Sequence, residues 1–344
     1  MGFPAFFYNQ IIVKPSLPAT SFANQTIIVT GSSTKPGLGR EAARHIARLG
    51  AGKIILAVRN TSAGEIAKQD IESSTNRPGV CEVWELDLAS YDSVLAFAEK
   101  ALQLARLDVL VNNAAVATKI FSLANTEHES PGVSLERSLT VNNISHFLLT
   151  LLLLPKLRQT AKDFPDRENP PYVTFLTSQS HAWPQFPQRN DTRGILKGLS
   201  DPATARMDER YPLTKMVATL WPRELVARLA GAENDPSVII TLVETGFCDT
   251  RLSRENQGYE EVAFDFFKKL FARTAEVGAR TTVAAVSGGP ETHGKYMVNG
   301  VVAEEALGGL AVSEEGKGVQ RRLWEEIREV LEGVRPGVLR GVGL

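Results

Sequence analysis

Residues 26–40 read TIIVTGSSTKPGLGR. The first five form a short apolar run rich in β-branched side chains, which is typical of a strand buried on both faces. From Leu38 to Leu49 the apolar side chains recur at the spacing of one helical face. A turn containing Gly31, Gly37 and Gly39 connects the two. The stretch therefore predicts a strand, a glycine-rich turn and a helix in direct succession.

The same alternation continues along the chain. Further strands are expected at 53–58, 80–86, 108–111, 172–177 and 237–243, and helices at 64–73, 90–105, 134–158 and 211–231. Strands separated by such helices pair in parallel through right-handed crossovers, and continuous Val/Ile/Leu strands need cover on both faces. The prediction is an α/β, Rossmann-type doubly wound parallel sheet with three α/β/α layers. We expect a single domain over 1–344, with an N-terminal arm at 1–25 and a C-terminal tail at 304–344.

Composition excludes several classes of function. The 344 residues include 38 basic and 39 acidic ones, so nothing points to a nucleic-acid partner. Cys81 and Cys248 cannot form a disulfide framework and suit a reducing compartment. The apolar run Phe147–Leu154 is shorter than the roughly 20 residues of a membrane span, and the N-terminus lacks the features of a signal peptide. No carboxylate or cysteine completes a metal site around His146 or His181. We expect a cytoplasmic protein without a metal.

The glycine-rich turn is a candidate binding site for a dinucleotide. Glycine permits unusual backbone angles and lets the main chain approach a pyrophosphate, while the following helix directs its free N–H groups at the anion. The alternative is a tight turn without a ligand, but a preceding strand and a following helix favour the binding site. The candidate contacts are Gly31, Ser33, Lys35, Gly37, Leu38 and Gly39.

Residues beyond the second and third strands bear on the choice of cofactor. Arg59 follows the second strand, where a guanidinium suits a 2′-phosphate and an acidic residue would suit the free ribose. With Lys35 or Arg40 nearby, it favours NADP(H). Both arginines could instead be ordinary solvated residues, and this alternative is strongest for Arg40. Asp87, after the third strand, is placed either to meet the adenine edge or to cap a helix.

A group of polar residues is suited to proton transfer. Tyr211 and Lys215 share one helical face, and an ammonium beside a phenol should lower the phenol pKa from about 10. Such a phenol can protonate a carbonyl oxygen while hydride attacks the carbon. Ser178 ends a strand and could orient the carbonyl, although Ser180 is a rival and a simple turn serine is the alternative. Asn142 lies within a long helix, where holding a water would explain a polar residue.

Two aromatic segments could enclose a substrate. The long stretch 182–210 has no clear periodicity, and a lid is expected at 251–273. An aromatic lining predicts a bulky hydrophobic carbonyl or alcohol, unless these side chains only pack the loops down. The aromatic and apolar candidates are Trp183, Phe186, Met207, Tyr259, Phe264, Phe266 and Phe267.

Taken together, these motifs resemble the short-chain dehydrogenase/reductase family over about residues 23–300, and in particular its fungal secondary-metabolite ketoreductases. The matching stretches are TGSSTKPGLG (30–39), LDLAS (86–90), NNAA (112–115), VNN (141–143), LTS (176–178), Tyr-x-x-x-Lys (211–215) and TGFCDT (245–250). The resemblance implies a catalytic tetrad of Asn142, Ser178, Tyr211 and Lys215. It also implies that Lys215 binds the nicotinamide ribose and Thr250 the carboxamide, and that Asn113 and Ala114 line the adenosine side.

The chain departs from the family pattern in its glycine loop. Five residues separate Gly31 from Gly37, where the family usually has three. In addition, NNAA replaces NNAG, and Thr245 stands where proline is common. None of these changes removes a member of the tetrad.

The leading hypothesis is an NADP(H)-dependent oxidoreductase that interconverts a ketone and a secondary alcohol on a bulky apolar substrate. An alternative is a dehydratase, isomerase or cyclase on the same fold, which only the longer glycine loop favours. A cofactor-sensing regulatory protein is a third hypothesis, against which the intact tetrad argues. The helices at 134–158 and 211–231 could pair into a homodimer, and the alternative is that the arm and the tail cover them.

Overall fold

The computed structural model describes residue 10 and residues 12–33, 35–125, 133–165, 169–230, 237–252 and 271–344. Its centre is an eight-stranded sheet with the order β10-β9-β8-β7-β4-β1-β2-β3, parallel except for the β9–β10 pair. The strands are β1 (Thr26–Thr30), β2 (Lys53–Val58), β3 (Cys81–Glu85), β4 (Val109–Asn112), β7 (Tyr172–Leu176), β8 (Ile239–Glu244), β9 (Tyr296–Val298) and β10 (Val301–Val302). A small antiparallel pair consists of β5 (Leu123–Ala124) and β6 (Leu135–Glu136).

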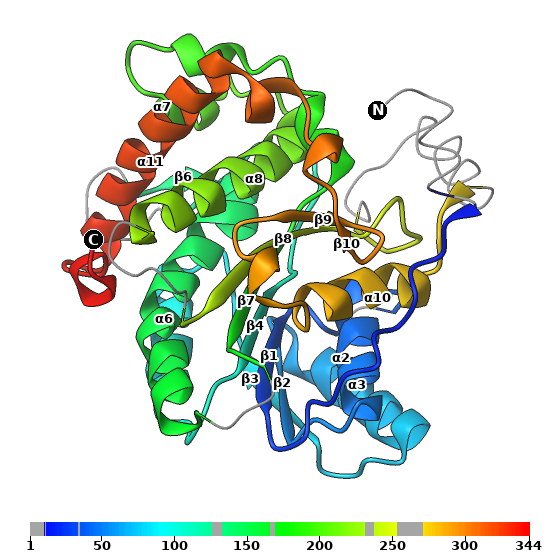
Figure 1. Cartoon of the computed structure of the whole chain (residues 1–344). Coiled ribbons are helices and arrows are strands. Elements are labelled where there is room, and N and C mark those ends of the chain that lie inside the picture. Colours follow the sequence, from blue (N-terminus) through cyan, green and yellow to red (C-terminus); the bar gives the residue numbers. More distant parts are fainter. Residues whose placement is uncertain are drawn as a thin grey trace.

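Helices cover both faces of the sheet (Figure 1). One layer contains α2 (Leu38–Arg48), α3 (Thr61–Thr75) and α10 (Ala275–Ala285). The other contains α4 (Tyr91–Leu102), α5 (Arg137–Leu139), α6 (Ser145–Asp163), α8 (Arg210–Leu229) and α11 (Glu314–Val334). The predicted three-layer, doubly wound fold is therefore confirmed.

The alternating burial of strand residues explains the two layers. In β1, Ile28 packs against the helices of one layer, whereas Ile27 and Val29 pack against those of the other. All five residues of β1 are buried, which agrees with the continuous apolar pattern of a central parallel strand. Burial of apolar side chains on both faces of β1 thus stabilises the packing of both helical layers against the sheet.

The segment 304–344, expected as a C-terminal tail, contributes α11 to the core. Trp324 of α11 stacks on Trp221 of α8 with ring centroids 5.4 Å apart, and Trp221 in turn stacks on Phe147 of α6 at 4.0 Å. Aromatic pairs of this kind contribute about 0.5–1.5 kcal/mol each beyond the burial of their surface. The segment is therefore a packed part of the helical layer over α6 and α8.

The expected helix at 134–158 begins and ends later than predicted. Its helical residues run from Arg137 to Asp163 and include a π-helical turn at Thr140–Ile144. By length and composition this segment could cross a membrane, but 89% of its most apolar window is buried inside the protein. The apolar run Phe147–Leu154 thus packs in the core, as expected of a buried helix.

Candidate active site

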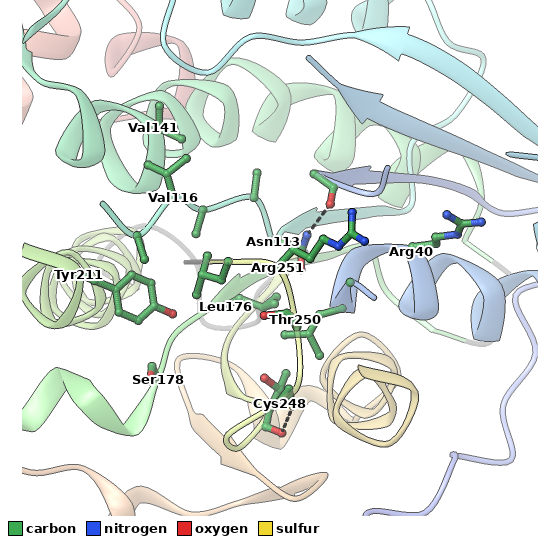
Figure 2. Close-up of a pocket in the computed structure, with 18 of the residues that line it drawn as sticks. Arg40, Asn113, Val116, Val141, Leu176, Ser178, Tyr211, Cys248, Thr250 and Arg251 are labelled. Atoms are coloured by element: carbon green, nitrogen blue, oxygen red, sulfur yellow. Dashed lines mark hydrogen bonds between the residues drawn. The ribbon is translucent and has the colours of Figure 1, made fainter. Parts of the chain in front are cut away.

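One large cavity opens at the carboxyl edge of the sheet. Its volume is about 2220 Å³, and its walls come from the residues that follow β1, β2, β4, β7 and β8. The predicted site residues that line it are Gly31, Ser33, Lys35, Gly37, Leu38, Arg59, Asp87, Asn113, Ala114, Ser178, Tyr211, Lys215 and Thr250. Figure 2 shows Tyr211 and Ser178 toward one end and Arg40 toward the other, with Asn113 between them. The glycine loop and the proton-transfer residues therefore share one space.

The glycines of the loop leave room for close backbone contacts. Gly31 has a φ of +68°, and a Cβ added there would lie 2.8 Å from Cα of Ala114. A Cβ on Gly39 would run into the side-chain amide of Asn113, which donates a 2.7 Å hydrogen bond to Thr30 O. Gly37 is the N-cap of α2 and offers no capping side chain, so the first N–H groups of this 11-residue helix stay available to an anion. These features fit a pyrophosphate.

The basic residues near the loop divide into two groups. Lys35 and Arg59 are exposed and, like Arg40, line the cavity, and Lys35 Nζ lies 3.8 Å from Asp70 Oδ1. Arg40 is buried and pairs with Asp70 at 2.7 Å, while Asp70 also receives a short bond from Arg44. Burial opposes ionisation of Asp70, but the hydrogen bonds from Arg44 and Arg40 lower its pKa to about 2. Arg40 is therefore not an ordinary solvated residue, because it is buried and paired with Asp70, whereas the side chains of Lys35 and Arg59 are exposed.

Asp87 does not cap a helix. Its carboxylate accepts a 2.9 Å hydrogen bond from the backbone N–H of Ala89 within the turn, and the N-cap of α4 is Ser90. The capping alternative is therefore wrong, and Asp87 lies in the wall of the cavity.

Tyr211 and Lys215 occupy the first turns of α8. Lys215 Nζ donates a 2.7 Å hydrogen bond to Leu176 O and lies 5.6 Å from the centre of the Tyr211 ring. Burial lowers the pKa of Lys215 to about 8. Burial, with a smaller contribution from the Cys248 thiol, raises the pKa of Tyr211 above its usual value. The expectation of a lowered Tyr211 pKa is therefore wrong for this structure, because Lys215 is directed at the end of β7 and desolvation of the phenol dominates.

Ser178 and its rival Ser180 lie side by side in the cavity wall. Ser178 is the N-cap of a 3-10 helix at Gln179–Ala182, and its Oγ accepts hydrogen bonds from Ser180 N at 3.2 Å and from Ser180 Oγ at 3.0 Å. Since Ser178 Oγ accepts both bonds, its own proton can be donated to a ligand. Ser180 thus supports the orientation of Ser178.

Asn142 lies in the π-helical turn and does not line the cavity. Its amide nitrogen donates to Val116 O at 2.9 Å and to Thr214 Oγ1 at 3.0 Å, and its oxygen accepts from Val116 N at 2.8 Å. Single π turns often occur at functional sites. The side chain ties the helix that carries it to α8 one turn away from Tyr211. The water-holding role stays a prediction.

His146 and His181 both support backbone near the cavity. His146 Nε2 lies 3.1 Å from Thr30 Oγ1, and burial lowers the pKa of this histidine to about 4. His181 Nδ1 lies 2.7 Å from Ser178 O. Neither histidine is among the residues that line the cavity, so of the two roles expected for them, packing or lining the substrate pocket, these contacts fit packing.

The wall expected for the substrate is only partly aromatic. Trp183 lines the cavity and is 68% exposed, whereas Phe186 is buried in the core and Met207 is not among the lining residues. Phe186 is therefore a packing residue, which agrees with the alternative that these aromatic side chains only pack the loops down. The lid candidates Tyr259, Phe264, Phe266 and Phe267 lie outside the described residues. Apolar lining residues that were not anticipated are Val116, Ile120, Val141 and Leu176.

Two carboxyl groups in the wall were also missed. Asp70 belongs to α3, and its contact with Arg40 joins residues 30 positions apart, a separation that helical spacing does not reveal. Glu244 ends β8, and an acidic residue at the end of an otherwise apolar strand was the available signal.

Comparisons with known proteins agree with this geometry. A family model described as short chain dehydrogenase matches residues 25–163. Short-chain dehydrogenase anuD of Penicillium roqueforti is 38% identical over 338 residues, covering 97% of this chain and 84% of that protein. Short chain dehydrogenase atnD of Emericella nidulans is 39% identical over 292 residues, covering 85% and 89%.

Solved structures share the fold. The NADP active-site complex of RhlG from Pseudomonas aeruginosa matches with a TM-score of 0.57 and 21% identity, covering 80% of this chain and 95% of that one. The NADPH-bound carbonyl reductase from chicken fatty liver gives a TM-score of 0.55 at 15% identity, covering 82% and 99%. At such identities the likeness concerns the fold alone.

Proposed function

The chain belongs to the short-chain dehydrogenase/reductase family, and on that premise we propose that it interconverts a ketone and a secondary alcohol with NADP(H). The observation that supports this most is that Tyr211, Lys215 and Ser178 line the same cavity as the glycine loop. Hydride donor and proton donor would then act on one carbonyl from within one space.

The residues present fit a dinucleotide. Gly31 and Gly39 leave a cradle that a Cβ would fill, and α2 directs its first N–H groups toward it. Lys35 and Arg59 are exposed cations in the same wall and would hold a 2′-phosphate, which favours NADP(H) over NAD(H). When bound, the nicotinamide supplies the hydride. Lys35 lies in the lengthened loop between Gly31 and Gly37 and adds a charge to this wall.

Each residue of the proposed machinery has a distinct task. Ser178 donates its hydroxyl proton to the substrate oxygen and orients the carbonyl. Tyr211 delivers a proton to that oxygen as the carbonyl carbon is reduced. Lys215, with a pKa lowered by burial to about 8, lies 5.6 Å from the centre of the Tyr211 ring and would resupply the proton. Asn142 positions the first turn of α8 through Thr214.

The substrate class follows from the wall. Val116, Ile120, Val141 and Trp183 give the substrate end of the cavity an apolar character, which suits a bulky hydrophobic ketone or alcohol. We propose a role in secondary metabolism, because the motifs resemble those of fungal secondary-metabolite ketoreductases and the relatives anuD and atnD also come from fungi. A cytoplasmic location stays a prediction.

A dimer that pairs α6 and α8 would need the outer surface of these two helices, but α11 of the same chain packs there. α11 packs on that layer through the stack of Trp324 on Trp221. We propose that the protein is a monomer. Light scattering of the purified protein should give the mass of one chain, and the mass of two chains would contradict this.

The experiment that tests the function is a pair of tyrosine variants. Purified protein with an aromatic ketone panel should consume NADPH, and Tyr211→Phe should reduce kcat by about 100-fold or more while leaving NADPH binding intact. Tyr91→Phe removes a hydroxyl that bonds Val133 O outside the cavity, and it should keep its activity. Full turnover by Tyr211→Phe would refute the mechanism. Failure to bind NADPH in a fluorescence titration would refute the redox reaction and support a dehydratase, isomerase or cyclase.

A further inference from the structure

The cavity wall contains a buried carboxyl group, that of Glu244, to which the proposed reaction assigns no role. Glu244 is the last residue of β8, is 7% exposed and lines the cavity. The neighbouring strand runs alongside it, with Thr177 N donating a 2.8 Å hydrogen bond to Val243 O. Glu244 therefore lies beside Thr177 and Ser178, near the place where Ser178 would orient the carbonyl group of the substrate.

One oxygen of this carboxyl is occupied. The hydroxyl of Tyr296, a fully buried residue of β9, donates a 3.0 Å hydrogen bond to Glu244 Oε2. Behind it, Gly308 N donates to His181 Nε2 at 3.2 Å, so the proton of the neutral imidazole is on Nδ1 and points at Ser178 O. His181 therefore does not compete for the Tyr296 proton, which is committed to Glu244.

The other oxygen is open. Within the parts of the chain that the structure describes, Glu244 Oε1 has no hydrogen-bond partner. The nearby guanidinium of Arg273 is bonded to Asn299 Oδ1 at 2.7 Å, and Lys215 Nζ is bonded to Leu176 O. Glu244 Oε1 is not among the buried unpartnered side-chain atoms, so it is accessible from the cavity that Glu244 lines. A ligand in the cavity can therefore donate a hydrogen bond to it.

We propose that Glu244 Oε1 binds a hydroxyl group of the substrate, so that the substrate is an apolar ketone or alcohol carrying a second oxygen function such as a phenol. This inference rests on the proposed function and narrows its substrate class.

The electrostatics of the site favour a hydroxyl over an amine. Burial raises the pKa of Glu244 to about 7, against the opposing effects of the Tyr296 hydrogen bond and the charge of Arg273. At neutral pH the group is thus present both as carboxylate and as carboxylic acid. A hydroxyl can donate to the first and accept from the second, whereas an ammonium would bind only the carboxylate and would face the positive charge of Arg273.

A matched substrate series tests the proposal. The probes are α-tetralone and its phenolic monohydroxy isomers, with kcat/KM measured by NADPH consumption. In the wild type we expect at least one hydroxylated isomer to exceed the parent ketone by about 10-fold, the effect of one hydrogen bond to a charged group. Glu244→Leu should bring this ratio close to one. Glu244→Gln should retain part of it, because the amide oxygen still accepts a hydrogen bond.

Tyr296→Phe is the matched control. It removes the partner of Oε2 and leaves the carboxyl in place, so the preference for the hydroxylated ketone should persist. If Tyr296→Phe loses the preference and Glu244→Leu keeps it, Glu244 only anchors β9 and the proposal is overturned. Should Glu244→Leu not fold, Glu244→Ser withdraws the carboxyl from the cavity and carries the same expectation.

The outcomes separate this inference from the function on which it rests. If no ketone is reduced, the proposed function is contradicted, and the same pairs are compared by calorimetric binding to the wild type and to Glu244→Leu. A preference for the hydroxylated isomer that Glu244→Leu abolishes supports the inference in either assay. A wild type without such a preference in either assay, or a Glu244→Leu variant that retains it, overturns it.

Discussion

The guanidinium of Arg210 lies against the carboxylate of Glu136, with Nε 3.3 Å from Oε2, and neither side chain has exposed surface. Arg210 begins α8 immediately before Tyr211. Glu136 accepts hydrogen bonds from the backbone N–H groups of Ser138 and Leu139, at the start of the helix that carries Asn142. This one ion pair therefore joins the beginnings of the two helices on which the proposed catalytic residues lie.

Removing one member of this pair should be costly. Arg210→Met leaves the Glu136 carboxylate buried without its counter-charge, and we expect the free energy of unfolding to fall by about 3–5 kcal/mol. Urea denaturation measures the change. The control is Arg193→Met, since Arg193 pairs with Asp191 and Asp201 at the surface, where a loss of less than about 1 kcal/mol is expected. Equal effects of the two substitutions would show that the buried pair does not stabilise the helix starts.

Acid should destabilise the protein through His146. An unfolded histidine has a pKa near 6.5, and burial lowers the pKa of His146 to about 4. Between these values the unfolded chain binds a proton that the folded chain does not, so stability falls as the pH drops through this window. From about pH 7 to about pH 5 the wild type should lose about 2 kcal/mol more than His146→Gln. Parallel stability curves for the two proteins would contradict the assignment.

Two glycines of α11 should respond to alanine in opposite directions. A Cβ on Gly318 meets nothing within 4 Å, so Gly318→Ala should stabilise the helix by about 0.5–1 kcal/mol. A Cβ on Gly316 would collide with the carbonyl of Leu310, and Gly316→Ala should cost about 1–3 kcal/mol. Thermal or urea unfolding distinguishes them. Equal changes of the same sign would refute the packing of α11 described above.

Arg59 should set the preference between the two dinucleotides. It is exposed in the cavity wall, and a charge-assisted bond to a 2′-phosphate is worth about 10- to 100-fold in affinity. Arg59→Ala should raise the dissociation constant of NADPH by that factor and change that of NADH little. Arg321→Ala, an exposed residue of α11, serves as the charge-matched control. A similar loss for both dinucleotides would place Arg59 elsewhere than at the 2′-phosphate.

Much of the fold can be predicted from the sequence, because the patterns of apolar residues that specify each strand and helix are local. A buried parallel strand is a short β-branched run, and the six predicted strands lie within a few residues of those observed. The location of the site follows from the same pattern, because a parallel sheet brings the ends of its strands to one edge. Thus Gly31, Ser178 and Tyr211 line one cavity although 180 positions separate the first from the last.

The features that were missed depend on contacts between distant residues. Packing in three dimensions, and not spacing along the chain, decides three of these features. They are the pairing of Arg40 with Asp70, the burial of Phe186 and the direction in which Lys215 points. The pKa of Tyr211 is an example: proximity of a lysine suggested a lowered value, but the degree of burial decides the sign. Likewise, Leu323, Trp324 and Ile327 indicate an apolar helical face, but not the helix that it covers.

The position of α11 has a consequence for biosynthesis. On the ribosome, α6 and α8 emerge before the segment that covers them, because residues 314–334 are translated later. During that interval the nascent chain exposes the ring face of Trp221 that later stacks on Trp324, on a surface of the kind that aggregates or recruits chaperones. The helical layer can thus close only after translation has passed α11, which makes premature termination upstream of this helix a route to misfolding even when every residue of the cavity has been made.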